Sequence, residues 1–106
     1  REGASDATQI ITKVFDNRDA ESLKHLAQAL ITHDSVIALL GSKDKDTARL
    51  VFARSSDAPG DMNALMKDAC EMLDGRGGGK PDMAQGGGKK VSRLEEAIRL
   101  AASRLN

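Results

Sequence analysis

VIALLGSKDKDTARLVFARS, residues 36–55, holds two apolar runs on either side of a charged segment. The first run, 36–40, is unbroken, which is typical of a strand buried on both faces of a sheet. Residues 42–46, SKDKD, favour a turn, and residues 47–54 return to a strand pattern. We therefore predict an antiparallel hairpin made of strands 36–40 and 47–54.

The segments on either side of this hairpin predict another strand and two helices. Residues 9–15, QIITKVF, are short and β-branched and favour a strand. Asp19 is placed to cap a helix that carries an apolar stripe. A second helix is predicted over 61–73, with Asp61 as its N-cap and Gly75 just past its last turn.

A closing helix follows the glycine-rich stretch, because Ser92 and Glu95 form the S-x-x-E pattern of a capping box. The predicted order is β-α-β-β-α-(Gly-rich loop)-α. This order predicts the α/β class, as a small two-layer domain with a mixed sheet of about three to five strands. The first two strands are expected to run parallel through a right-handed crossover.

Composition limits the class of protein. A chain of 106 residues is long enough for one core and too short for two. Two phenylalanines are its only aromatic residues, which argues against nucleic-acid binding by stacking bases on aromatic rings. The single cysteine, Cys70, allows no internal disulfide and fits a reducing compartment. Without a signal peptide or a long apolar run, we expect a cytoplasmic protein and no membrane partner.

Charge is unevenly distributed although the formal net charge is zero. Residues 1–75 hold nine Lys and Arg against thirteen Asp and Glu, a balance of minus four. Residues 76–106 hold seven against three, a balance of plus four. The last third therefore predicts a basic face toward an anion. Residues 1–8 are polar and small, and we interpret them as a linker or frayed lead-in. Because the chain opens on Arg1, we interpret 9–106 as a single domain of a larger protein.

The positive third begins at GRGGGKPDMAQGGGKK, residues 75–90. One interpretation is a solvated surface loop. The other is an anion cradle, in which consecutive glycines let backbone N–H groups converge on a phosphate while nearby basic side chains add charge. The stretch does not match a nucleotide-binding P-loop, because a predicted helix rather than a strand precedes it. The residues alone leave both interpretations open.

GGGKPDMAQGGG, together with FARSSDAPGDMNALMKDA at 52–69, resembles the DHH-associated domain at the C-terminus of alanyl-tRNA synthetases and of AlaX-type alanyl-tRNA editing proteins. The resemblance covers roughly residues 20–105 and is nearer to the editing proteins. It implies a mixed sheet with helices. Related domains in DHH phosphoesterases carry a histidine where Lys80 stands, which argues against hydrolysis and leaves a phosphate contact intact.

The resemblance implies a non-catalytic accessory domain of an alanyl-tRNA editing protein that contacts the phosphate backbone of tRNA, expected to be alanine tRNA. The alternatives are the C-terminal domain of an alanyl-tRNA synthetase, which is a ligase, and a structural dimerisation module. A weak homodimer is compatible with each. The candidate phosphate- or RNA-binding residues are Arg76, Gly77, Gly78, Gly79, Lys80, Gln85, Gly86, Gly87, Gly88, Lys89 and Lys90.

No catalytic or metal site is predicted. His25 and His33 are eight residues apart and lack paired-ligand spacing, and Cys70 is expected to be buried and inert. We expect no cofactor in this chain, and a zinc ion only in an upstream domain of the parent. Arg54 is expected either to be a solvated strand end or to face a phosphate.

Overall fold

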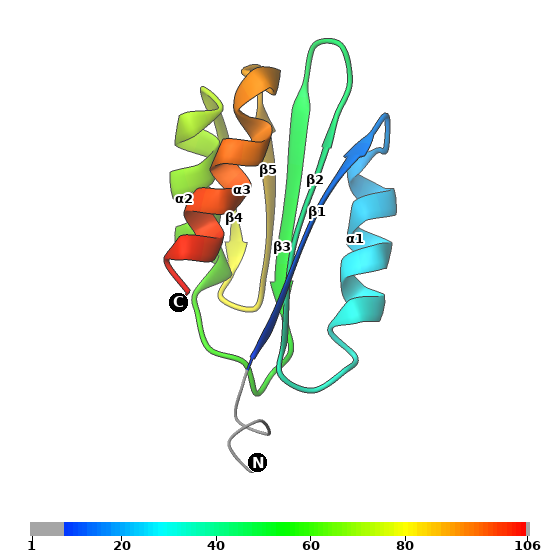
Figure 1. Cartoon of the computed structure of the whole chain (residues 1–106), viewed down its shortest axis with the longest axis vertical. Coiled ribbons are helices and arrows are strands. Elements are labelled where there is room, and N and C mark those ends of the chain that lie inside the picture. Colours follow the sequence, from blue (N-terminus) through cyan, green and yellow to red (C-terminus); the bar gives the residue numbers. More distant parts are fainter. Residues whose placement is uncertain (1–7, 106) are drawn as a thin grey trace.

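The computed structural model describes residues 8–105, which form a five-stranded mixed sheet with helices on both faces (Figure 1). The sheet order is β1-β2-β3-β5-β4. The strands are β1 (Gln9–Asp16), β2 (Val36–Lys43), β3 (Ala48–Arg54), β4 (Gly75–Lys80) and β5 (Met83–Gly88). The helices are α1 (Ala20–Leu30), α2 (Met62–Met72) and α3 (Leu94–Ser103). The α/β class with a mixed sheet is confirmed, and most of the lead-in predicted at 1–8 lies outside the described residues.

Strands β1 and β2 are parallel and are connected through α1, as the sequence predicts. Gln9 lies beside Val36, and this register continues along the whole of β1. Asp19 is the N-cap of α1, and its Oδ1 accepts a hydrogen bond from the Ser22 N–H at 2.8 Å. The cap satisfies one of the N–H groups that the first turn of a helix leaves free.

Strands β2 and β3 form the predicted antiparallel hairpin at the centre of the sheet. Every β2 residue except Lys43 is buried, which agrees with the unbroken apolar run of the sequence. In the turn, Asp44 Oδ1 accepts hydrogen bonds from the N–H groups of Asp46 and Thr47 at 3.0 and 2.9 Å. A carboxylate that bonds its own turn in this way is a common means of closing a hairpin.

Helices cover both faces of the sheet, so the domain has three layers where two were predicted. Leu39 and Phe52 lie in the core formed with α2 and α3, while Leu40 and Val51 lie in a second core formed with α1. Neighbouring strand residues point to opposite faces, and both sets are apolar here. A central strand of this kind needs cover on both sides, which places α1 opposite the other two helices (Figure 1).

The glycine-rich stretch forms two strands and not the loop that the sequence predicts. β4 and β5 pair antiparallel through a turn at Pro81 and Asp82, and β5 pairs with β3. The glycine-rich residues therefore extend the sheet by two strands beyond β3. Helix α2 ends at its C-cap Leu73, and Asp74, with a left-handed φ of 58°, lies just past its last turn where Gly75 was predicted. Gly75 instead begins β4.

The starts of α2 and α3 differ in how well they were predicted. Asp61 is the N-cap of α2, and its carboxylate accepts two backbone N–H groups, as predicted. The capping box is wrong, because Ser92 lies inside a 3-10 turn, Val91–Arg93, and no side chain caps α3. Glu96 pairs with Arg93 instead, at 3.1 Å. Across residues 8–105, no helix has the length and hydropathy needed to span a membrane.

Candidate functional site

Alternate glycines of the β4–β5 hairpin lie against helix α2. A Cβ on Gly77 would come within 2.7 Å of Cys70 Sγ, and a Cβ on Gly86 within 2.6 Å of the same atom. A Cβ on Gly88 would overlap the backbone of Leu73. Because no Cβ approaches another atom so closely in proteins, only glycine allows α2 to pack onto this part of the sheet.

The glycine triplets do not form an anion cradle of the expected kind. Such a cradle needs successive N–H groups that converge through a left-handed residue. Within residues 8–105, Gly60 is the only glycine with a positive φ, at 106°, and the triplets are extended strands. At the sheet edge, the Gly79 N–H donates to Asn63 Oδ1 of α2 at 2.9 Å. Helix packing is therefore the first physical reason for the glycines.

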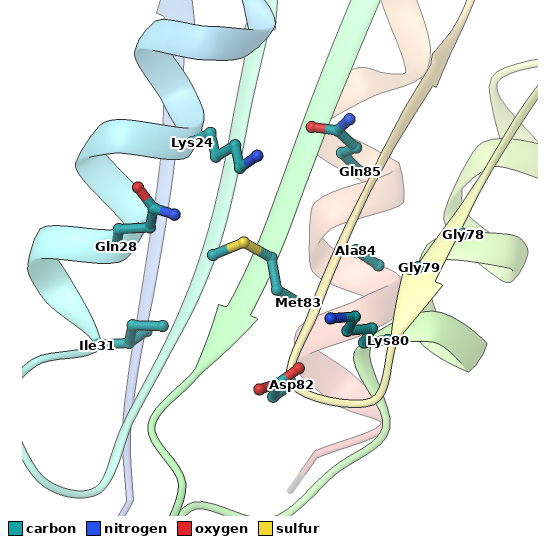
Figure 2. Close-up of a pocket in the computed structure, with 10 residues that line it drawn as sticks. All are labelled: Lys24, Gln28, Ile31, Gly78, Gly79, Lys80, Asp82, Met83, Ala84 and Gln85. Atoms are coloured by element: carbon teal, nitrogen blue, oxygen red, sulfur yellow. The ribbon is translucent and has the colours of Figure 1, made fainter.

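The opposite face of the hairpin is open beside α1. Helix α1 packs on β2 and β3, and the hairpin extends past it (Figure 1). A groove of about 550 Å³, which we call the α1–hairpin groove, lies between them (Figure 2). From α1 it is lined by Lys24, Gln28 and Ile31. From the hairpin it is lined by Gly78, Gly79, Lys80, Asp82, Met83, Ala84 and Gln85.

The α1–hairpin groove has an apolar floor and a polar rim. Its floor is formed by the half-buried side chains of Ile31 and Met83, while the side chain of Ala84 is buried in the core with α2 and α3. The rim side chains are exposed, and in Figure 2 those of Lys24 and Gln85 point toward one another across one end. The other rim residues are Gln28, Lys80 and Asp82. An apolar floor with a few polar groups above it is typical of a ligand site.

The structure brings together only part of the predicted site. Gly78, Gly79, Lys80 and Gln85 all line the α1–hairpin groove. Arg76 lies outside it, beside a smaller hollow formed with α2.

The remaining predicted residues lie elsewhere. Lys89 and Lys90 follow the far end of β5, and Lys89 Nζ lies 3.3 Å from a carboxylate oxygen of Asp74. Gly77, Gly86 and Gly88 face α2, and a Cβ on Gly87 would overlap the backbone of Ala48 in β3. Strand geometry separates these residues, because it sends neighbouring positions to opposite faces and its two ends far apart.

Sequence reasoning missed the wall that α1 contributes. Lys24, Gln28 and Ile31 are about fifty residues away in sequence from the hairpin that they face. Their spacing of three and four residues indicates one helix face, which is the only local signal. That signal could identify the site only after β4 and β5 had been recognised as strands lying beside α1.

The histidines and the cysteine do not form a metal site. His25 lines a hollow next to the α1–hairpin groove, together with Lys24 and Gln85. Cys70 is buried, and burial raises the pKa of its thiol. Across residues 8–105, no three His, Cys, Asp or Glu side chains lie close enough to hold a metal ion.

The structure also shows where Arg54 and two methionines of α2 lie. The Arg54 guanidinium is held by backbone carbonyls, because its Nε donates to the Gly60 carbonyl at 2.8 Å and its Nη1 to the Ser55 carbonyl at 3.2 Å. It therefore holds the loop that leads to α2. A shared exposed patch of Met62, Met66 and Ala102 would favour the dimerisation alternative, but Met62 and Met66 are fully buried in the core.

Fold and groove together define a small α/β domain with an open groove between a helix and a glycine hairpin. The model of one family, the DHHA1 domain, matches residues 7–106. The chain belongs to the DHHA1 domain family, which agrees with the resemblance found in the sequence.

Curated relatives of this chain include alanine–tRNA ligases. An alanine–tRNA ligase of Leptospira borgpetersenii is 43% identical over 97 residues, which cover 88% of this chain and 10% of the relative. An alanine–tRNA ligase of Pseudomonas entomophila is 36% identical over 96 residues, covering 88% of this chain and 11% of the relative. The chain thus spans about a tenth of the length of these relatives.

A solved structure shows the same fold. The C-Ala domain of the Aquifex aeolicus alanyl-tRNA synthetase superposes with a TM-score of 0.82 at 26% identity. The match covers 91% of this chain and 89% of that chain. These relatives support the synthetase alternative better than the editing protein that the sequence was first taken to favour.

Proposed function

We propose that this chain is the C-terminal domain of an alanine–tRNA ligase and that it holds tRNA by its phosphate backbone. The observation that carries the proposal is the α1–hairpin groove, which places Lys24 and Lys80 on the rim of an open face in a domain related to these ligases. The parent enzyme would then act in the cytoplasm, and alanine tRNA would be the partner.

The electrostatics of the groove support weak binding. Lys24 and Lys80 are exposed point charges that suit phosphate oxygens without fixing a base sequence. Arg76 lies on the same strand as Lys80, four residues away and outside the groove, and we propose that it contacts a further phosphate. Few contacts by one small domain imply an affinity of about micromolar or weaker at physiological salt.

A tRNA titration at several salt concentrations tests the proposal. With about three phosphates engaged, the logarithm of affinity should fall against the logarithm of salt concentration with a slope of about −2 to −3. Lys80→Ala and Lys24→Ala should each weaken binding and make that slope shallower by about 1. Both variants should stay folded, because an exposed lysine contributes little to the free energy of unfolding.

Lys45→Ala is the matched control, since Lys45 is exposed in the β2–β3 turn and does not line the groove. It should leave the salt slope unchanged. The proposal fails if the wild-type chain does not bind tRNA at low salt, or if all three lysine variants bind as the wild type does.

A further inference from the structure

The floor of the α1–hairpin groove offers a binding surface that phosphate contacts leave unused. Ile31 and Met83 supply apolar side-chain atoms at the floor, and the backbone of Gly78 and Gly79 forms a side wall without side chains. A phosphate gains nothing from an apolar surface, because burying charge there costs free energy. A flat, partly apolar group such as a nucleobase gains from it.

The polar rim points to the same kind of ligand. Gln28 and Gln85 carry side-chain amides, each able both to donate and to accept hydrogen bonds. Asp82 lies beside Lys80 at the turn end of the groove (Figure 2). An ionised carboxylate only accepts hydrogen bonds and repels phosphate, so a ligand group that contacts Asp82 must donate and must carry no negative charge.

We propose that the α1–hairpin groove takes one unstacked nucleobase of bound RNA and prefers a base with an amino group, adenine, cytosine or guanine, over uracil. The base lies on Met83, its amino group donates to Asp82, and the amides of Gln28 and Gln85 contact its remaining edge. Uracil carries no amino group, and the two carbonyl oxygens on either side of its ring N–H meet the carboxylate unfavourably. The proposal rests on the proposed function, because Lys24 and Lys80 hold the flanking phosphates.

The size of the groove is compatible with this occupant. Its volume of about 550 Å³ lies within the range of about 300–1,000 Å³ that is typical of small-molecule sites. The groove contains no aromatic side chain, so the base is held by thioether and peptide surfaces. Affinity for an isolated base is therefore weak, and selectivity comes from the hydrogen bonds of the rim.

Nucleosides without phosphate separate base recognition from phosphate binding. We would titrate the isotope-labelled chain with cytidine, adenosine and uridine and follow its side-chain amide and methyl signals by NMR. Cytidine and adenosine should shift the amide signals of Gln28 and Gln85 and the methyl signal of Met83, and uridine should shift them far less. If none of the nucleosides shifts these signals, or if all three do so equally, the inference is overturned.

Single-stranded ten-residue RNAs test the role of Asp82. The chain should bind oligo-C and oligo-A about fivefold to tenfold more tightly than oligo-U, which is the usual size of one good base contact. Asp82→Asn should bring this ratio near one, whatever it does to absolute affinity through its charge. Asp46→Asn, which removes an exposed turn carboxylate outside the groove, should keep the ratio.

The two proposals fail in different ways. Loss of tRNA binding and of its salt dependence would remove the proposed function together with the base site. A salt-dependent affinity for tRNA with equal affinity for oligo-C and oligo-U would leave the phosphate function standing and exclude the base site. Shifts at the groove caused by an extended peptide, with none caused by any nucleoside, would also exclude it.

Discussion

Cys70 of α2 and Gly86 of β5 lie so close together that no side chain fits between them. A Cβ on Gly86 would come within 2.6 Å of Cys70 Sγ and within 2.6 Å of the Cα of Gly77 on the neighbouring strand. Cys70 is itself fully buried. The smallest residue on the sheet and a small thiol on the helix therefore set the distance between the two layers.

Gly86→Ala should destabilise the domain by about 1–3 kcal/mol, because the added methyl group must push α2 away from the hairpin. Gly78→Ala is the control, since its Cβ would meet Asn63 Oδ1 at 3.0 Å and otherwise only Lys67 Cε at 3.9 Å. It should change the free energy of unfolding by less than about 1 kcal/mol. Urea unfolding followed by circular dichroism measures both. Equal stability of the two variants would show that this contact does not set the spacing.

Cys70 should resist alkylation in the native domain. The thiol is buried, and burial raises its pKa, so little of the reactive thiolate is present or accessible near neutral pH. Mass spectrometry after iodoacetamide treatment at about pH 8 should show slow modification in buffer. The same protein in urea, which serves as the control, should be modified rapidly. Comparable rates in the two conditions would contradict the packing described for α2.

Asp57 should make the domain less stable in acid. Its carboxylate accepts the Ser35 N–H at 2.9 Å and the Ser55 hydroxyl at 2.8 Å, and these bonds lower its pKa from 3.8, the Ser35 N–H most strongly. Below about pH 5 the unfolded chain takes up the proton more readily than the folded one. The free energy of unfolding therefore falls as the pH falls toward the folded pKa, while the contribution of Asp57 is complete at neutral pH.

Asp57→Asn should reduce the difference in the free energy of unfolding between about pH 7 and pH 3. Urea titrations at the two pH values measure it. Asp46→Asn removes an exposed turn carboxylate and controls for the loss of one negative charge. If both variants keep the acid sensitivity of the wild type, the Asp57 bonds do not contribute to it.

The sequence predicts the inner part of the fold well, because there local pattern and tertiary environment agree. The apolar run at 36–40 is buried in the central strand, and Asp19 and Asp61 cap the helices they precede. The hairpin at 75–88 was not predicted, because glycine has low strand propensity on its own. Here pairing with β3 and close packing under α2 outweigh that propensity.

Only the part of the candidate site that lies in the glycine-rich segment was predicted. Lys80 and Gln85 belong to the segment that the sequence singles out, and both line the groove. Lys24 and Gln28 come from a helix with no sequence link to that segment. Lys89 and Lys90 look close to Lys80 in the sequence, but a strand places them at the other end of β5. Spacing in sequence measures distance only when the local structure is known.

At the glycine hairpin, a single layer of backbone without intervening side chains separates the hydrophobic core from the groove. Cys70 lies against Gly77 and Gly86 on the core side, and the adjacent positions Gly78 and Gln85 line the groove on the other. Elsewhere in the sheet, side chains on both faces separate the two sides and can adjust to small changes in volume. At the hairpin, a larger side chain at position 70 would press directly on the backbone of Gly77 and Gly86, and we expect it to alter the width of the groove. Residues of the α2 core are therefore candidates for tuning recognition without touching the ligand.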